Sequence, residues 1–208
     1  MIKTIFLHVG VHKTASTTIQ NTFFQECAKL LEAGVLYPVF KAGNIAISNH
    51  SIPYYSLFRE HPEKYHINVS CGYTNSEAIN TLHEEYSRQL RGQIMGFKGE
   101  TLVISGEDIS HLQKDELVKL RTYFLEMTHP ETSFKVVMMC RHPVSRFRSA
   151  IQASVCDFGM PMNKTIQNHL LRTNYYRNLT SNFSEVFGIE NISVIKYEDA
   201  ITNRYGPA

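Results

Sequence analysis

The chain has 208 residues, of which 43% are hydrophobic, and its formal net charge at pH 7 is +2. This length and apolar content suit one globular domain with its own core, so we expect residues 1–208 to form a single domain. Because no basic run exceeds two adjacent residues, the composition argues against a dedicated nucleic-acid-binding protein. No apolar run approaches the ~18 residues of a membrane span, and the cysteines show no metal-ligand spacing.

The N-terminus leads directly into an apolar run at 4–9, so we expect no signal peptide and a cytoplasmic protein. Several N-x-[ST] triplets are also present, and such triplets are glycosylated in secreted proteins. They begin at Asn49, Asn68, Asn163, Asn178, Asn182 and Asn191. The alternative is therefore a lumenal catalytic domain from which a membrane anchor has been removed.

The N-terminal half of the chain begins with a short buried strand at 4–9, followed by a helix from Ser16 to Glu32 with one apolar face. Gly34 then suits the end of that helix, because glycine readily adopts the left-handed conformation found there. Further along we expect a strand at 35–37, a loop at 40–50, a helix at 51–59, an irregular segment at 61–73, and a helix at 76–95 capped by Ser76.

The C-terminal half alternates strands and helices more regularly. We expect strands at 101–105, 134–140 and 192–195, and helices at 114–127, 143–156 and 166–187. Such spacing predicts an α/β fold of three layers, with a mainly parallel sheet flanked by helices as in P-loop nucleotide-binding proteins. Ligands of open parallel sheets bind beyond the carboxyl ends of the strands. Polar residues follow three predicted strands, at Gly10–Lys13, Glu107 and Arg141.

The junction between the first strand and the first helix has the composition of an anion-binding loop. Free backbone N–H groups and the positive end of a helix attract a phosphate-like anion. Lys13 adds a full positive charge, and hydroxyl donors follow at Thr14, Ser16, Thr17 and Thr18. The loop is not the GxxxxGK[ST] pattern of nucleoside triphosphatases, because no glycine directly precedes the lysine.

This loop resembles the 5′-phosphosulfate loop of sulfotransferases that use 3′-phosphoadenosine 5′-phosphosulfate (PAPS). That family usually has K-[ST]-G-T-T, and this chain has Lys13-Thr14-Ala15-Ser16-Thr17, with alanine in place of glycine. The resemblance implies that the loop binds PAPS. The implied binding residues are Gly10, His12, Lys13, Thr14, Ala15, Ser16, Thr17 and Thr18.

A second motif extends the resemblance. The 3′-phosphate element of these sulfotransferases has R-x-P near a strand end and a serine eight residues after the arginine, which Arg141 and Ser149 match. A guanidinium offers two parallel donors to a phosphate, and a hydroxyl adds another. Weaker similarities to bacterial and carbohydrate-type members occur at Gly34–Pro38, Ser105–Glu107, Phe187–Ile192 and Tyr197–Glu198, so that the resemblance spans about residues 5–199.

The resemblance implies transfer of a sulfuryl group from PAPS to a hydroxyl or amine of a carbohydrate or small molecule, leaving 3′,5′-ADP and requiring no metal. Lys13 then neutralises the charge that grows on the leaving phosphate oxygen. Glu107 is the first choice for the base that takes the acceptor's proton, and His50 is the second. Acceptor specificity is expected from residues 40–75 and 156–170.

Two alternatives stay open at this point. A P-loop kinase using Mg·ATP would use Thr101–Asp108 as the strand and acid that hold Mg²⁺, but the chain lacks GxxxxGK[ST]. A non-catalytic nucleotide-binding protein would bind 3′,5′-ADP without turnover. Family members usually continue into a basic, glycine-containing segment that closes over the nucleotide, and we expect that segment to be missing here after Asp199.

Overall fold

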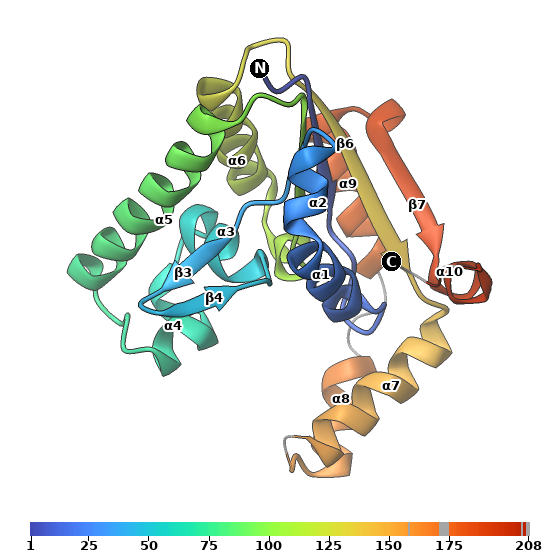
Figure 1. The fold of residues 1–208 in the computed structure, drawn as a ribbon. Helices are drawn as coiled ribbons and strands as arrows, with labels where there is room; N and C mark the ends of the chain where they lie inside the picture. The colour runs from blue at the N-terminus through green and yellow to red at the C-terminus, as the bar shows by residue number, and fades with distance from the viewer. Residues whose placement is uncertain (158, 171–174, 205, 207–208) are drawn as a thin grey trace.

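The computed structural model describes residues 1–157, 159–170, 175–204 and 206 (Figure 1). The strands are β1 (Thr4–His8), β2 (Val35–Leu36), β3 (Phe40–Ala42), β4 (Ile45–Ile47), β5 (Thr101–Ser105), β6 (Ser133–Cys140) and β7 (Ile192–Lys196). The α-helices are α1 (Ser16–Gln25), α2 (Cys27–Glu32), α3 (Ser51–Phe58), α4 (His66–Ser70), α5 (Ser76–Gly96), α6 (Lys114–Met127), α7 (Pro143–Cys156), α8 (Met162–Leu170), α9 (Tyr175–Phe187) and α10 (Tyr197–Thr202). Short 3₁₀ helices occur at η1 (Pro62–Lys64), η2 (Asp108–His111) and η3 (Ile189–Asn191).

A parallel sheet of five strands in the order β2-β5-β1-β6-β7 forms the centre of the molecule and confirms the predicted α/β fold. Strand β1 is central, and Leu7 is in register with Ile104 of β5 on one side and Val136 of β6 on the other. Because the chain leaves β1 to form β5 on one side and β6 on the other, the carboxyl end of β1 is a topological switch point. Ligands of such folds bind there.

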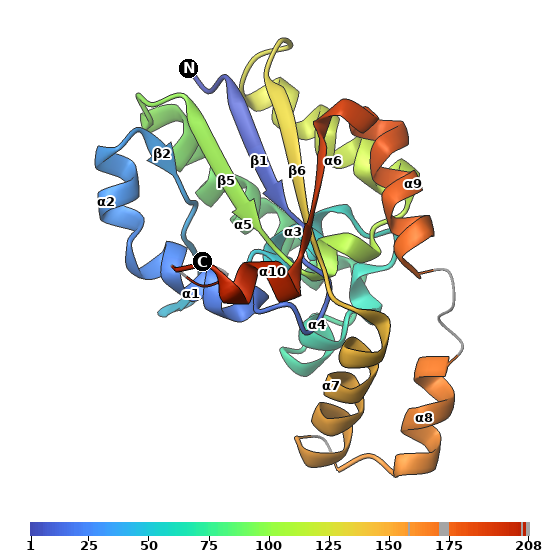
Figure 2. The ribbon, with the colours of Figure 1, turned by 90° about the vertical axis from the view of Figure 1, so that its right-hand side faces the viewer.

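The two faces of the sheet are covered unequally. Along β1, Ile5 and Leu7 are fully buried, whereas Phe6 between them is 39% exposed. The buried side chains pack with Tyr54 of α3 and Phe124 of α6 in one hydrophobic core. Figure 2 looks onto the sheet, with α5 and α6 behind it and with α1 and α2 near the β2 edge.

Two predicted elements differ from the structure in the N-terminal half. The helix expected from Ser16 to Glu32 ends at Gln25, because Glu26 has φ −95° and ψ 11°, and α2 restarts after it. The loop expected at 40–50 contains a β3–β4 hairpin, whose turn includes Gly43 at φ +59°. Glycine adopts this left-handed conformation without steric penalty.

Three other predictions need correction. Asn75, not Ser76, caps α5, because its side-chain oxygen accepts a hydrogen bond from the Ala78 N–H at 2.9 Å. The segment expected to be irregular at 61–73 includes η1 and α4. Two helices, α8 and α9, replace the single helix expected at 166–187, and residues 171–174 between them lie outside the described residues.

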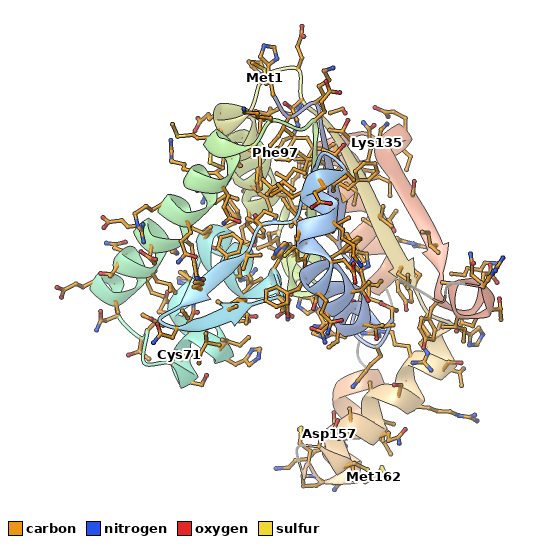
Figure 3. The ribbon with its side chains drawn as sticks, viewed as in Figure 1. Met1, Cys71, Phe97, Lys135, Asp157 and Met162 are labelled. Carbon is orange, nitrogen blue, oxygen red and sulfur yellow. The ribbon has the colours of Figure 1, made fainter. Side chains whose placement is uncertain are left out.

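Helices α7 and α8 pair with each other and project from the carboxyl end of the sheet (Figures 1 and 2). Asp157 and Met162 mark the outer end of this pair, whereas side chains fill the space between the sheet and α5 and α6 (Figure 3). Within the described ranges, no helix combines the length and apolar character needed to cross a bilayer.

Candidate functional site

The predicted anion-binding loop lies at the carboxyl end of β1, at the switch point of the sheet. Backbone hydrogen bonds fix its start, because Val9 N–H donates to the Val137 carbonyl at 2.9 Å and Gly106 N–H donates to the His8 carbonyl at 3.0 Å. The loop then leads into α1, which supplies free backbone N–H groups and the positive end of its dipole.

Two non-glycine residues of the loop have left-handed backbone conformations, Lys13 at φ 73° and Ala15 at φ 61°. Such a conformation destabilises an L-residue by about 1–2 kcal/mol. Loops that alternate left-handed and right-handed residues are known to form anion-binding nests of backbone N–H groups. Ala15 adopts this conformation at a steric penalty that a glycine would not have.

Gly10 is required by packing, not by its backbone angles. A Cβ atom at this position would lie 2.7 Å from Ser16 Oγ and 2.8 Å from His8 Nε2, which is too close for either. Ser16 Oγ and His8 Nε2 are both buried and have no hydrogen-bond partner. Buried polar atoms are nearly always hydrogen-bonded, so these two mark the loop as a place where a polar ligand fits.

The hydroxyl residues of the loop divide into two kinds. Thr14 is fully buried, and its hydroxyl donates to the Val11 carbonyl at 2.6 Å. Its hydroxyl hydrogen is therefore used to brace the loop, and only its backbone N–H is left for an anion. Thr17 and Thr18 are exposed in the first turn of α1.

Lys13 is the cation of the loop. Its side chain is half-buried, and among the described residues no acidic group forms an ion pair with its ammonium. A lysine in this state keeps its charge available for an anionic ligand.

Arg141, at the end of β6, contacts the loop directly. Its Nη1 donates to the Lys13 carbonyl at 3.0 Å, and its guanidinium carbon lies 4.7 Å from the centre of the Tyr197 ring. Its Nε is buried and has no hydrogen-bond partner. The structure thus brings two predicted site residues, Lys13 and Arg141, together.

Ser149 is not brought to the same place by any hydrogen bond. It lies on α7, which projects away from the sheet (Figure 1), and no bond joins it to Arg141 or to the loop in the described part of the chain. Its predicted role at a 3′-phosphate stays a prediction.

Glu107 lies beside the loop and is linked to it through His12. His12 Nδ1 is 3.3 Å from Glu107 Oε1, and His12 Nε2 is 2.9 Å from Asp108 Oδ1. Burial alone lowers the pKa of His12, but hydrogen bonds and charges of the two carboxylates outweigh burial and raise this pKa to about 9. His12 is therefore an imidazolium at neutral pH and acts as a donor between two carboxylates.

Asp108 is held from several directions. Tyr65 Oη donates to its Oδ2 at 2.6 Å, and its backbone N–H donates to Ser51 Oγ at 3.0 Å. Burial opposes ionisation of Asp108, yet the hydrogen bonds from His12 and Tyr65 keep its pKa below the ordinary value. Asp108 is thus a fixed carboxylate next to the loop.

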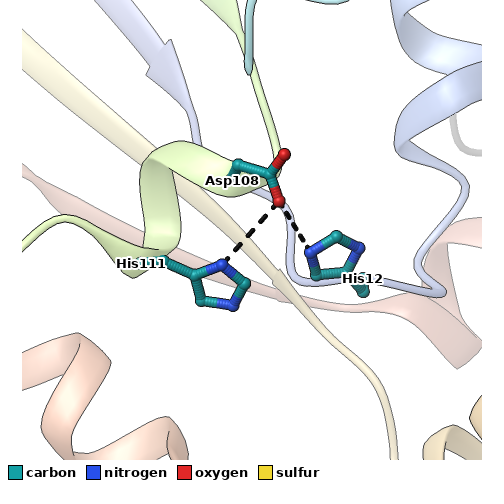
Figure 4. Close-up of side chains that lie close together, drawn as sticks. All are labelled: His12, Asp108 and His111. Carbon is teal, nitrogen blue, oxygen red and sulfur yellow. Dashed lines mark ion pairs between the residues drawn. The ribbon is translucent and has the colours of Figure 1, made fainter. Parts of the chain in front are cut away.

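Figure 4 shows His12, Asp108 and His111 converging, with one oxygen of Asp108 facing both rings. His111 Nδ1 is 3.7 Å from Asp108 Oδ1, and the ligand atoms of the three residues all lie within 4.8 Å of one another. Residues of these types can ligate a transition metal, whereas the resemblance to sulfotransferases implies that no metal is required. The pairing of His12 with two carboxylates accounts for this arrangement without an ion.

His50, the second choice for the base, lies away from any ligand. It is fully buried, its Nε2 is 2.7 Å from the Pro38 carbonyl oxygen, and its Nδ1 accepts from the Ser105 N–H at 3.1 Å. Burial lowers its pKa to about 4, against a smaller raising effect of the Pro38 hydrogen bond. With both ring nitrogens bonded to backbone, His50 joins the hairpin segment to β5 and does not reach an acceptor.

A pocket of about 450 Å³ opens beside His12. It is lined by His12, Tyr55, Arg59, His61, Lys64, Tyr65, His66, Asp108 and His111. Part of this wall lies in the region 40–75 that was expected to carry acceptor specificity. His111 was not predicted as a site residue, and Asp108 was named only within the kinase alternative, although their separation by three positions after a strand end could have indicated the pair.

No protein-family model matches the chain, and no curated protein matches its sequence. A solved structure of a sulfotransferase from Alicyclobacillus acidocaldarius has a TM-score of 0.47 and 16% identity, covering 98% of this chain and 76% of that chain. A shikimate kinase from Bacteroides thetaiotaomicron has a TM-score of 0.40 and 13% identity, covering 97% of this chain and 89% of that chain. Likenesses this distant carry no argument about the reaction.

Proposed function

We propose that this protein is a sulfotransferase that moves a sulfuryl group from PAPS to a hydroxyl or amine of an acceptor. One observation supports the proposal above the others: the loop from Gly10 to Thr18 combines two left-handed residues with a lysine that has no acidic partner among the described residues, and Arg141 donates a hydrogen bond to that loop from the end of β6. Buried, unpartnered Ser16 Oγ and Arg141 Nε fit anionic oxygens at both places.

PAPS supplies the sulfuryl group, which leaves the 5′-phosphate oxygen of the nucleotide for the acceptor oxygen or nitrogen. Lys13 and the backbone N–H groups at the start of α1 stabilise the charge that grows on the leaving phosphate oxygen. His12 lies at the same end of the loop, but its positive charge is balanced by Glu107 and Asp108, so Lys13 is the cation that faces the leaving oxygen. No metal is needed in this scheme, because the chain's own cations provide the charge.

The acceptor's proton goes to a carboxylate. Glu107 remains our first choice, and its side chain is 21% exposed beside His12. His50 is no longer a candidate base, because both of its ring nitrogens are bonded to backbone. Asp108 lines the pocket and becomes the competing choice. Either carboxylate accepts the proton as the new bond to sulfur forms.

Thermal stabilisation by nucleotides tests this function. We expect 3′,5′-ADP to raise the melting temperature more than ADP or AMP does, with no effect of Mg²⁺. Arg141→Ala should abolish the preference for 3′,5′-ADP over ADP, because the guanidinium is the stronger donor to the extra phosphate. Arg148→Ala is the matched control, since Arg148 is exposed on α7.

Equal stabilisation by ADP and 3′,5′-ADP would remove the sulfotransferase proposal. A kinase is the second candidate, favoured by the acidic pair Glu107-Asp108 that follows β5 after Gly106, and Mg²⁺-dependent stabilisation by ATP would support it. A protein that binds 3′,5′-ADP but gives no turnover with any acceptor would be a non-catalytic nucleotide-binding protein.

A further inference from the structure

Three side chains that can ligate a metal converge at the edge of the pocket beside His12. Asp108 and His111 begin and end the 3₁₀ helix η2, in which side chains three positions apart lie on the same face. His12 comes from the anion-binding loop, and its Nε2 lies 2.9 Å from Asp108 Oδ1. His111 Nδ1 lies 3.7 Å from the same oxygen, so two rings from different elements face one carboxylate oxygen (Figure 4).

The separations of these three ligand atoms suit a single ion. All three atoms lie within 4.8 Å of one another. Bonds from zinc to nitrogen and oxygen are about 2.0–2.2 Å long, so two ligand atoms at a tetrahedral angle are about 3.3 Å apart. The two separations from Asp108 Oδ1, 2.9 Å and 3.7 Å, lie on either side of that value. Modest side-chain rotations would therefore bring the three atoms to bonding distance of one ion.

The other polar atoms of His12 and Asp108 are already bonded. His12 Nδ1 lies 3.3 Å from Glu107 Oε1, and Tyr65 Oη donates to Asp108 Oδ2 at 2.6 Å. In metalloproteins a ligating histidine commonly donates its second ring N–H to a carboxylate, and a ligating carboxylate accepts hydrogen bonds from its surroundings. Both patterns occur here, and they orient His12 Nε2 and Asp108 Oδ1 toward the same position.

A proton holds this position when no ion is bound, because His12 and Asp108 share it as an ion pair. That pair requires only two of the three residues. His111 adds a third ligand atom, and its 3.7 Å from Asp108 Oδ1 is longer than a hydrogen bond. Its ring stacks on that of His12, with centres 5.2 Å apart. Because a ligating histidine is neutral, an ion takes the place of the shared proton, which passes to solvent.

The cluster is open to solvent on the side of the pocket, whose lining includes all three residues. The side chains of His12 and His111 are 39% and 32% exposed, so an ion can enter from solvent. Three protein ligands with a further position open to a pocket are typical of catalytic zinc sites. Two imidazoles and one carboxylate favour zinc and its transition-metal neighbours over Mg²⁺ and Ca²⁺, which prefer oxygen ligands.

We propose that His12, Asp108 and His111 bind a divalent transition-metal ion of the Zn²⁺ class. Glu107 and Tyr65 hold two of these ligands in position, and a water molecule or a donor group of a molecule in the pocket completes the coordination. Because His12 belongs to the anion-binding loop, a bound ion ties that end of the loop to η2. The assignment does not depend on the proposed sulfuryl transfer, which uses no metal.

Calorimetric titration with Zn²⁺ tests the site, after dialysis of the protein against EDTA and in the absence of nucleotide. We expect one ion per chain and no comparable binding of Mg²⁺. His111→Ala should weaken Zn²⁺ binding by at least about 100-fold, because loss of a ligand exceeds the about 10–100-fold effect of losing an outer partner. His66→Ala is the matched control and should bind as the wild type does, since His66 is an exposed histidine of the same pocket outside the cluster.

Tyr65→Phe is the second variant, because it keeps the ring and removes only the hydrogen bond to Asp108. We expect it to weaken Zn²⁺ binding by about tenfold or more, and it carries the test if circular dichroism shows that His111→Ala is unfolded. No binding of Zn²⁺, equal binding of Mg²⁺, an equal loss in His66→Ala, or unchanged affinity in either folded variant would overturn the assignment. Failure of the proposed function appears separately, as absent stabilisation by 3′,5′-ADP.

Discussion

The two sides of the candidate site are built differently. On the β5 side, buried side chains join separate segments: His8 Nδ1 lies 2.7 Å from Ser105 Oγ, and His50 joins Pro38 to Ser105. On the β6–β7 side, apolar side chains are exposed, with Val194 at 56% and Ile195 at 40%. The end of the site that would perform the transfer is therefore preorganised, whereas the end that would hold the rest of the nucleotide is open.

This difference follows from position in the sheet. Strand β5 lies between β2 and β1 and is buried along most of its length, but β7 is an edge strand with one neighbour. Polar residues at the carboxyl end of a buried strand must find partners, because an unpaired buried group is costly. Residues at an edge strand are solvated and are under no such constraint.

The largest effect is expected at Lys13. Lys13→Met should reduce sulfuryl transfer by about 100-fold or more, because the charge on the leaving oxygen loses its main neutralising group. Release of 3′,5′-ADP from PAPS in the presence of an acceptor measures this, and the melting temperature should not fall. Lys98→Met is the matched control at an exposed position. Retained turnover would remove Lys13 from the mechanism.

His50→Ala tests whether the β5 side is structural. The side chain is fully buried with both ring nitrogens bonded to backbone, so its removal leaves a cavity and two unpaired backbone groups. We expect a loss of about 2–3 kcal/mol in the free energy of unfolding, measured with urea. His142→Ala, at an exposed position, should change it little. Unchanged stability in His50→Ala would contradict a structural role.

The two histidines affect the pH dependence of stability in opposite senses. Protonation of His12 stabilises the folded protein because its pKa is raised, whereas protonation of His50 destabilises it because its pKa is lowered. The His12 pKa of about 9 exceeds the unfolded value of 6.5, so its contribution to stability is fully present below pH 6.5 and is lost as pH rises through 9. Because its side chain is 39% exposed, screening limits this contribution to about 1 kcal/mol. Urea unfolding of the wild type and His12→Gln should differ at pH 6 and converge above pH 9. A difference that grows with pH would contradict the pairing.

The smallest effect is expected at Ala15. Because its φ is 61°, Ala15→Gly relieves a left-handed strain and should stabilise the protein by about 0.5 kcal/mol after the entropy of glycine in the unfolded chain is subtracted. Ala33→Gly is the control, since Ala33 has φ −81° and should be destabilised by that entropy. Equal destabilisation of both variants in thermal melts would show that the loop carries no such strain.

The alternation of apolar runs and helical patterns was enough to predict the parallel sheet. The run at 4–9 and the run at 101–105 are continuous in apolar character, which is typical of strands buried on both faces. The hairpin at 40–47 was missed, since its strands are only three residues long and too short to show alternation. The break at Glu26 was also missed, because no glycine or proline marks it.

The sequence by itself determined the loop, its lysine and the arginine that follows β6. Each of these features is identified by a short run of adjacent residues, and the chemistry of those residues does not depend on distant contacts. Only the tertiary structure decided that His50 is buried, that Thr14 braces the loop, and that His12 is held between two carboxylates. Those roles depend on which segments meet. The strand order places β5 and β6 on either side of β1 and so brings residues about 100 positions apart within hydrogen-bond distance, as His8 and Ser105 show.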